Sequence, residues 1–188
     1  VTLMVPANNN VEVSEILVDD LEVLDGETVD LAAGTTRVDV SVETVDPDAT
    51  YAVVGDSGLV LGENTMVITV TAADGETTQD YTITLFVPSN DTAVTSFVIN
   101  GVPSVPGDIV LVDAGTESVD VEVTTRDENA KVTVVGADVL VGGNNDILVT
   151  VTAQDGSTQD YAFVVRVGGQ SADTALTSLT LNGQSVAD

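Results

Sequence analysis

The sequence predicts an all-β fold made of tandem antiparallel β-sandwich domains, with almost no helix. Three observations lead to this prediction: the apolar residues are mostly valine, apolar and polar residues alternate in several segments, and most of the chain occurs twice. The length of 188 residues fits one large domain or two small ones, and not a multi-domain enzyme.

The composition favours sheet over helix. Hydrophobic residues make up 43% of the chain but aromatic residues only 3%, and threonine is the main polar companion of valine. β-Branched residues fit a pleated, half-buried surface and are poor helix formers. No segment keeps an apolar period of about 3.6 residues, so we expect almost no helix.

Alternation with a period of two marks the expected strands. Polar residues separate valines in segment 36–45, at Val38, Val40 and Val42, and in segment 117–125, at Val119, Val121 and Val123. Such a period places one face of a strand on a core and the other in water. Two more strands flank the turn at Asp74-Gly75, with expected core faces Met66, Ile68, Val70, Ala72 and Tyr81, Ile83, Leu85, Val87.

The chain repeats itself at an offset of 81 positions. Three pairs of segments match at this offset: TRVDVSVET (36–44) with ESVDVEVTT (117–125), VVG (53–55) with VVG (134–136), and TVTAADG (69–75) with TVTAQDG (150–156). Beyond that hairpin the offset falls to 80, where QDY (79–81) matches QDY (159–161), which indicates a one-residue deletion in a turn. A recurring unit of this kind predicts a modular array.

The two ends of the chain match the inside of the repeat. VTLMVP (1–6) resembles ITLFVP (83–88), and DTALTSLTLNG (173–183) resembles DTAVTSFVING (91–101). We therefore expect residues 1–7 to be the last strand of a preceding repeat, 8–90 and 91–171 to be β-sandwich repeats, and 172–188 to be the first strand of a following repeat. The chain is then a window taken from a longer array.

The charge is strongly one-sided, with 31 acidic residues against four basic ones and a formal net charge of −27. Nucleic acid is excluded as a partner because binding a phosphate backbone needs clustered Lys and Arg. No apolar run has the length of about 18 residues that a spanning helix needs, so we expect no membrane insertion in this segment. An acidic surface suits a salty medium or bound cations.

The residue types leave little room for catalysis. The chain contains no His and no Cys, the usual general base, nucleophile and zinc ligands. The close carboxylate pairs Asp19/Asp20 and Asp46/Asp48 lie beside expected turns, where nothing apolar promises the raised pKa of a general acid. We therefore expect no enzyme activity and assign no catalytic, cofactor-binding or metal residue.

Calcium is the strongest site hypothesis, although it is weighed against an ordinary role in turns. Calcium prefers several carboxylate and carbonyl oxygens from loops, and the candidates are Asp46-Pro47-Asp48, Asp127-Glu128-Asn129, Asn144-Asn145-Asp146, Asn90-Asp91 and Asp173. Asp, Asn and Pro are also plain turn formers, and no segment matches an EF-hand loop. The sequence leaves open whether Asp46/Asp48, Asp127/Glu128 or Asn90/Asp91 bind the ion.

Two tyrosines open matching strands at equivalent positions. Tyr81 and Tyr161 each follow Gln-Asp near the end of a repeat. We expect them to pack at the edge of the core, with the hydroxyl group bonded to the backbone, and not to stack on a ligand. The chain has no Trp, three Tyr and three Phe, so few aromatic residues are available to form a sugar-binding platform of exposed rings.

These motifs resemble the bacterial cadherin-like β-sandwich repeats, a branch of the immunoglobulin-like group. The matching elements are an opening Leu176, Leu179, Asn182-Gly183, and a closing G-x-N…TVTAxDG…QDY, found as Gly62, Asn64, 69–75 and Tyr81 and again as Gly143, Asn145, 150–156 and Tyr161. The resemblance covers the whole chain and implies modular display in secreted, surface or phage structural proteins, without a common active site. One departure is Asp19-Asp20, which stands where the other repeats have Asn-Gly.

From these observations we expect a structural repeat segment of an extracellular surface protein, such as a stalk, fibre, adhesin or surface layer, that spaces or displays other domains. Two alternatives stay open: a virion structural or decoration protein of a phage, and a glycan- or receptor-binding module. The expected location is extracellular, on a cell surface or a virion surface. The expected partners are neighbouring repeats, and a homo-oligomer or filament formed by exchange of the terminal strands is a further hypothesis.

Overall fold

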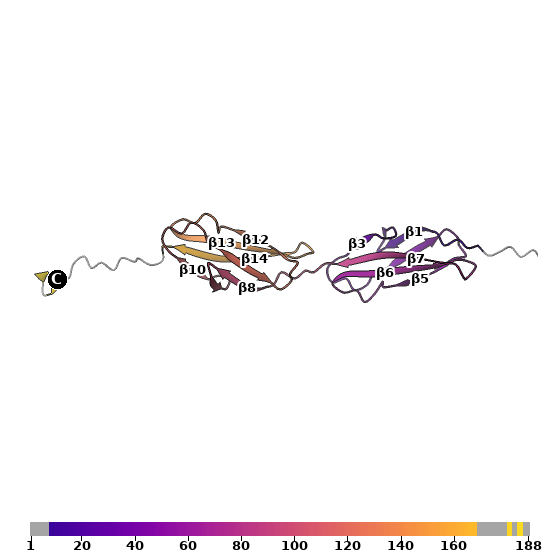
Figure 1. Cartoon of the computed structure of the whole chain (residues 1–188), viewed down its shortest axis with the longest axis horizontal. Helices are drawn as coiled ribbons and strands as arrows, with labels where there is room; N and C mark the ends of the chain where they lie inside the picture. The colour runs from indigo at the N-terminus through magenta and orange to yellow at the C-terminus, as the bar shows by residue number, and fades with distance from the viewer. Residues whose placement is uncertain (1–7, 169–179, 182–183, 186–188) are drawn as a thin grey trace, which may run out of the picture. The chain divides into compact units, whose positions relative to one another are not determined.

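A computed structural model describes residues 8–168, 180–181 and 184–185 of the chain. These residues form strands and turns and no helix, as the sequence predicts (Figure 1). The chain divides into two compact units between Asp91 and Thr92, with Ala153–Ser157 grouped with the first unit. Compactness does not establish that a unit is a repeat of an array, so the predicted ranges 8–90 and 91–171 stay a prediction.

The first unit is a sandwich of two sheets. Its strands are β1 (Val13–Val18), β2 (Leu21–Glu22), β3 (Thr28–Asp30), β4 (Val40–Thr44), β5 (Thr50–Val54), β6 (Gly62–Thr71) and β7 (Thr78–Val87). One sheet has the order β2-β1-β4 and the other β3-β7-β6-β5. All neighbouring strands are antiparallel except β3, which runs parallel to β7. The sequence did not predict this pairing, because no hairpin connects the two strands.

The second unit has the same strands in the same order. They are β8 (Val94–Ile99), β9 (Val102–Ser104), β10 (Ile109–Val112), β11 (Val121–Thr125), β12 (Lys131–Val135), β13 (Gly143–Thr152) and β14 (Thr158–Val167). The sheets have the orders β11-β8-β9 and β10-β14-β13-β12, and β10 runs parallel to β14. Each unit is therefore an all-β sandwich of three and four strands.

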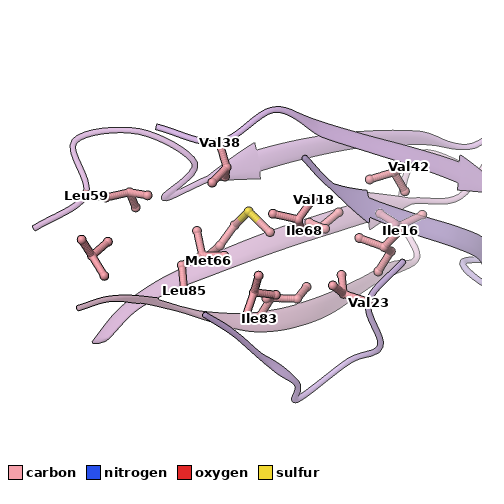
Figure 2. Close-up of a cluster of buried hydrophobic side chains, with 13 residues drawn as sticks. Ile16, Val18, Val23, Val38, Val42, Leu59, Met66, Ile68, Ile83 and Leu85 are labelled. Atoms are coloured by element: carbon pink, nitrogen blue, oxygen red, sulfur yellow. The ribbon is translucent and has the colours of Figure 1, made fainter. Parts of the chain in front are cut away.

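The core of the first sandwich lies between its two sheets (Figure 2). The predicted faces of the long hairpin are confirmed, since Met66, Ile68 and Val70 on β6 and Ile83 and Leu85 on β7 are all 0% exposed. Strand β4 begins later than segment 36–45 suggests, but the expected valines still contact the core: Val38 and Val42 are buried and Val40 packs against them. The alternation of apolar and polar residues was thus sufficient to predict the buried face.

The core of the second sandwich contains an aromatic cluster that the first lacks. Phe163 is 1% exposed, and its ring lies 4.9 Å from the ring of Phe97 in an edge-on arrangement. The ring of Phe97 lies 5.0 Å from that of Tyr161. Edge-on and tilted pairs at these separations are favourable beyond the area that they bury.

The first hairpin of each sandwich turns in two residues, both with positive φ. These are Asp19 (48°) and Asp20 (66°) in the first sandwich, and Asn100 (50°) and Gly101 (77°) in the second. The register is the same in both, with Val18 opposite Leu21 and Ile99 opposite Val102. The departure from Asn-Gly therefore leaves this turn unchanged.

A third short hairpin repeats this register near the end of the chain. Strands β15 (Thr180–Leu181) and β16 (Gln184–Ser185) pair as Thr180 with Ser185 and Leu181 with Gln184. Two residues separate the strands, as in the hairpins β1–β2 and β8–β9. The rest of the predicted segment 172–188, and the predicted strand in residues 1–7, lie outside the described residues.

Candidate functional site

The first calcium candidate, Asp46-Pro47-Asp48, forms a tight turn between β4 and β5. The carbonyl oxygen of Asp46 accepts hydrogen bonds from Ala49 N at 3.1 Å and from Thr44 Oγ1 at 2.9 Å. Its carboxylate oxygen Oδ1 accepts from Asp48 N at 3.1 Å. The side chain of Asp46 is 8% exposed, and among the described residues its Oδ2 atom has no hydrogen-bond partner. Asp46 therefore shapes its own turn.

The second candidate, Asp127-Glu128-Asn129, forms the equivalent turn between β11 and β12. Ala130 N donates to the carbonyl oxygen of Asp127 at 3.2 Å, and Asn129 N donates to its Oδ1 at 2.9 Å. Glu128 is exposed. The recurrence of the turn at the same offset has a structural cause, because the side chain of the first residue replaces a missing backbone acceptor.

The asparagine of the G-x-N motif holds a loop in place in both sandwiches. Asn64 Nδ2 donates to the carbonyl oxygens of Val60, Gly62 and Leu85 at 2.8, 3.0 and 3.3 Å. Its Oδ1 accepts from Val60 N at 2.9 Å. Asn145 makes the same four contacts in the second sandwich, with its amide directed at backbone groups. The third calcium candidate therefore uses its central side chain for folding.

We expect replacing Asn145 by Ala to lower the free energy of unfolding by about 2–3 kcal/mol, because four backbone groups lose their partner. Asn145→Asp should be at least as harmful, since a carboxylate cannot donate to three carbonyl oxygens. Asn144→Ala, one residue earlier and exposed, is the control and should change stability by less than about 0.5 kcal/mol. Urea unfolding monitored by circular dichroism measures all three, and equal effects of the two alanines would contradict the assignment.

The Asp-Gly turn of each long hairpin carries the carboxyl groups whose pKa is shifted. The Thr77 hydroxyl donates to Asp74 Oδ2 at 2.6 Å, and the amides of Thr77 and Glu76 both donate to Oδ1 at 2.8 Å. These bonds hold the pKa of Asp74 below its usual value of 3.8. Ser157 lowers the pKa of Asp155 in the same way, through its hydroxyl group and its amide. Both shifts run opposite to what a general acid requires.

The lowered pKa of Asp74 predicts a defined pH dependence of stability. A carboxyl whose pKa is lower in the folded state stabilises the fold above its unfolded pKa, and this contribution is lost as the pH falls through the folded value. Wild type should therefore be more stable than Asp74→Asn at pH 7, and the two should converge as the pH falls below the folded pKa of Asp74. Thermal melts at several pH values test this, and a difference that persists in acid would overturn it.

The tyrosine of the QDY motif joins the last strand to the start of its own sandwich. Tyr81 Oη donates to the carbonyl oxygen of Val11 at 2.9 Å, and Tyr161 Oη donates to that of Thr92 at 3.0 Å. Both rings are half-buried against their cores. The prediction of edge packing with a backbone hydrogen bond is confirmed.

The remaining residues of the two motifs also have structural roles. Thr69 Oγ1 donates to Asp80 Oδ1 at 2.7 Å between β6 and β7, and Thr150 donates to Asp160 at 2.7 Å between β13 and β14. The internal repeat related Thr69 to Thr150 and Asp80 to Asp160, but it did not show that the threonine bonds to the aspartate. The register of each hairpin places Thr69 directly opposite Asp80, which explains why TVTA and QDY occur together.

The structure also places Asp39 beside Asp19 and Asp20, a grouping that the sequence did not predict. Asp19, Asp20 and Asp39 line a shallow hollow beside Leu17 and Val40, because β1 and β4 are paired. Asp19 Oδ1 accepts from Asp39 N at 2.8 Å, so this carboxylate supports the adjoining turn. Within the described ranges, no three Asp, Glu, His or Cys side chains are grouped to hold a metal ion.

The last two calcium candidates add little to this description. Asp91 N donates to Ser89 Oγ at 3.2 Å, which again marks a local turn at the joint with Asn90. Asp173 lies outside the described residues.

We expect that adding EDTA leaves the melting temperature within about 1 °C and that millimolar calcium does not raise it. The reason is that calcium would raise the melting temperature only if it bound to the folded state. A rise of several degrees with calcium would contradict this expectation.

Among the residues described, none forms a helix long and apolar enough to cross a membrane. The pKa values of Asp74 and Asp155 are lowered, and the candidate carboxylates of Asp46 and Asp127 act as turn acceptors. The fold and the loops thus define an all-β protein made of antiparallel sandwiches. Its recurring polar residues stabilise turns and loops through hydrogen bonds.

No protein-family model matches the sequence, and no curated protein matches it. Several solved structures are similar in fold. The fibronectin(III)-like modules of Clostridium thermocellum CbhA share 14% identity at a TM-score of 0.33, covering 81% of this chain and 94% of that one. Drosophila N-cadherin EC1-4 shares 11% at 0.32, covering 76% and 48%. A SusE-like surface-located polysaccharide-binding protein of Bacteroides thetaiotaomicron shares 12% at 0.29, covering 83% and 34%. The likeness to bacterial cadherin-like repeats remains a resemblance.

Proposed function

We propose that this chain is a structural segment of an extracellular surface protein and that its sandwiches space or display other domains. The observation that carries the proposal is the recurrence of one folding unit with the same strand order, turns and pinned loops. The hairpin β15–β16 adds the opening register of that unit once more. Modules that repeat in this way extend a chain in equal increments.

The side chains that recur between the sandwiches support a mechanical role. Asn64 and Asn145 each hold a loop in place through hydrogen bonds to backbone groups. Tyr81 and Tyr161 likewise bond to backbone carbonyl oxygens at the start of their sandwiches. Residues kept for recognition would instead be exposed and free to meet a ligand. The repeated positions therefore favour a stable scaffold over a binding module.

The dense negative charge fits a role at an exposed surface. With 31 acidic and four basic residues, neighbouring copies of the chain repel one another over the Debye length of about 8 Å at physiological salt. Such repulsion favours solubility and keeps crowded copies apart. The same composition leaves few Lys and Arg positions for trypsin-like proteases.

Single-molecule force spectroscopy of the full chain tests the proposal. Two independent sandwiches should unfold in two steps of equal size, each releasing about 25 nm, the extended length of roughly 80 residues less the folded length. One step of twice that length would mean a merged unit and would remove the modular spacer. Antibody labelling of intact cells and of purified virions then separates a cell-surface protein from a virion component, and labelling of neither would contradict surface display.

A further inference from the structure

The outer face of one sheet in the second sandwich carries an exposed apolar patch, although strand alternation would normally make this face polar. Its exposed members include Ile109 and Leu111 at 56% each, Val135 at 62% and Leu148 at 39%. The register joins them, because Ile109 lies beside Val164, and Leu148 lies between Val135 and Ala162. We call this set the outer apolar face: Ile109, Leu111, Val135, Leu148, Ala162 and Val164.

The fold does not require the β10 and β14 part of this face to be apolar, whereas Val54 and Val67 in the first sandwich match Val135 and Leu148. In the first sandwich the equivalent positions on β3 are Thr28 and Asp30, and those on β7 are Thr82 and Thr84. A sheet with the same topology therefore tolerates polar residues there. A contiguous exposed apolar patch of a few hundred Å² on a soluble domain typically marks an interaction site.

The charged residues around the outer apolar face are balanced in sign, unlike those of the chain as a whole. Alternation places Lys131 and Arg166 on the same side of the sheet as Asp146 and Asp160, so the four charges cancel. The whole chain carries −27. This face is thus a locally neutral region where a second acidic chain can approach with little repulsion.

We propose that the outer apolar face binds the same face of a second copy of this chain in a two-fold symmetric contact. A symmetry axis lying across β14 at Phe163 stacks the two β14 strands in opposite directions. Arg166 then lies over Asp160 of the partner subunit, and Val164 lies over Ala162 of the partner subunit. About this axis strand β14 is self-complementary in both charge and apolarity, as a symmetric interface requires.

The size of the face sets the strength of the contact. Strands β10, β12, β13 and β14 cover about 500 Å² at the usual strand spacing and rise. A standard interface buries about 800 Å² per partner, so the contact is weak, with a micromolar or higher dissociation constant. Copies held together on one surface would associate through it, because tethering raises their effective concentration.

Sedimentation velocity of the full chain from about 10 µM to 1 mM, in 0.5 M NaCl to screen the distant charges, tests the proposal. Wild type should form a dimer as concentration rises. The double variant Ile109→Thr/Leu111→Asp should weaken dimerisation at least tenfold, and should fold because Thr28 and Asp30 occupy these positions in the first sandwich. Arg166→Asp, a second variant outside the core, should weaken it as well.

A matched control is Leu24→Asp, which changes a residue 69% exposed on the first sandwich and should leave the dimer unchanged. The proposal fails if wild type stays monomeric at 1 mM, which would mean that another protein or another part of this chain covers the face. It fails equally if the double variant dimerises as well as wild type, or if Leu24→Asp has the same effect.

Discussion

Gly136→Ala is expected to destabilise the second sandwich by about 3 kcal/mol or more. Gly136 has a φ of 92°, in the region that side chains disfavour by about 1–2 kcal/mol. An added Cβ would also overlap the carbonyl oxygen of Asp146, and the Cα of Ile147 lies 3.6 Å from it. The overlapping oxygen is a backbone atom of β13 and cannot rotate away, so the strand itself must shift.

The matched control for Gly136→Ala is Gly143→Ala. Gly143 has a similar φ of 98°, but a Cβ added there meets nothing within 4 Å. This variant should lose only the conformational contribution of about 1–2 kcal/mol. Differential scanning calorimetry resolves the transition of each sandwich, and equal shifts for the two variants would show that close approach at Gly136 is unimportant. Gly55 and Gly62 offer the same comparison in the first sandwich.

Phe163→Ala is expected to lower the free energy of unfolding of the second sandwich by about 3–5 kcal/mol. Its ring is 1% exposed and contacts Phe97 edge-on, so the truncation leaves a cavity and an unpartnered ring. The first sandwich has Ile83 at this position, also fully buried. Phe163→Ile should therefore be tolerated better, at about 1–2 kcal/mol, because most of the volume is kept.

Urea unfolding of the full chain measures both substitutions of Phe163. The second transition should move to lower urea in proportion to the loss, while the transition of the first sandwich stays in place because each unit has its own core. A shift of both transitions would mean that the two cores are energetically coupled. An alanine variant as stable as wild type would contradict the packing described for Phe163.

The sequence predicted the sheets because the information for them is local. Alternation places Met66, Ile68 and Val70 on one face without reference to the rest of the chain, and Asp74-Gly75 fixes the hairpin between β6 and β7. Recurrence at a fixed offset then extended the interpretation to the second sandwich. The parallel pairing of β3 with β7 was not accessible, since its partners are far apart in sequence.

The roles of single residues were harder to predict than the strands. The VVG motif was visible as a repeat, but the reason for its glycine is a carbonyl oxygen on another strand. Asn145 was grouped with possible calcium ligands because its residue type suits both tasks, and only the loop geometry assigns its amide to backbone groups. Tyr161 was predicted correctly because a half-buried phenol has few ways to satisfy its hydroxyl group.

The outer apolar face could not be predicted either. Ile109 and Leu111 follow the same alternation as any half-buried strand, and only the sheet order shows that Val110 and Val112, and not their neighbours, point into the core. Comparison with Thr28 and Asp30 was possible from sequence, but its meaning depends on knowing which side of β10 is covered.

The parallel edge strand gives each sandwich a particular resistance to stretching. Backbone bonds from β3 and the preceding loop reach β7 at several points, including Gly26 N to Thr82 O at 2.8 Å and Leu31 N to Phe86 O at 2.8 Å. Tension along β7 would load these bonds together and in shear, whereas tension across a hairpin peels bonds one after another. A tether attached after β7 would thus hold until several bonds break at once, and then give way abruptly.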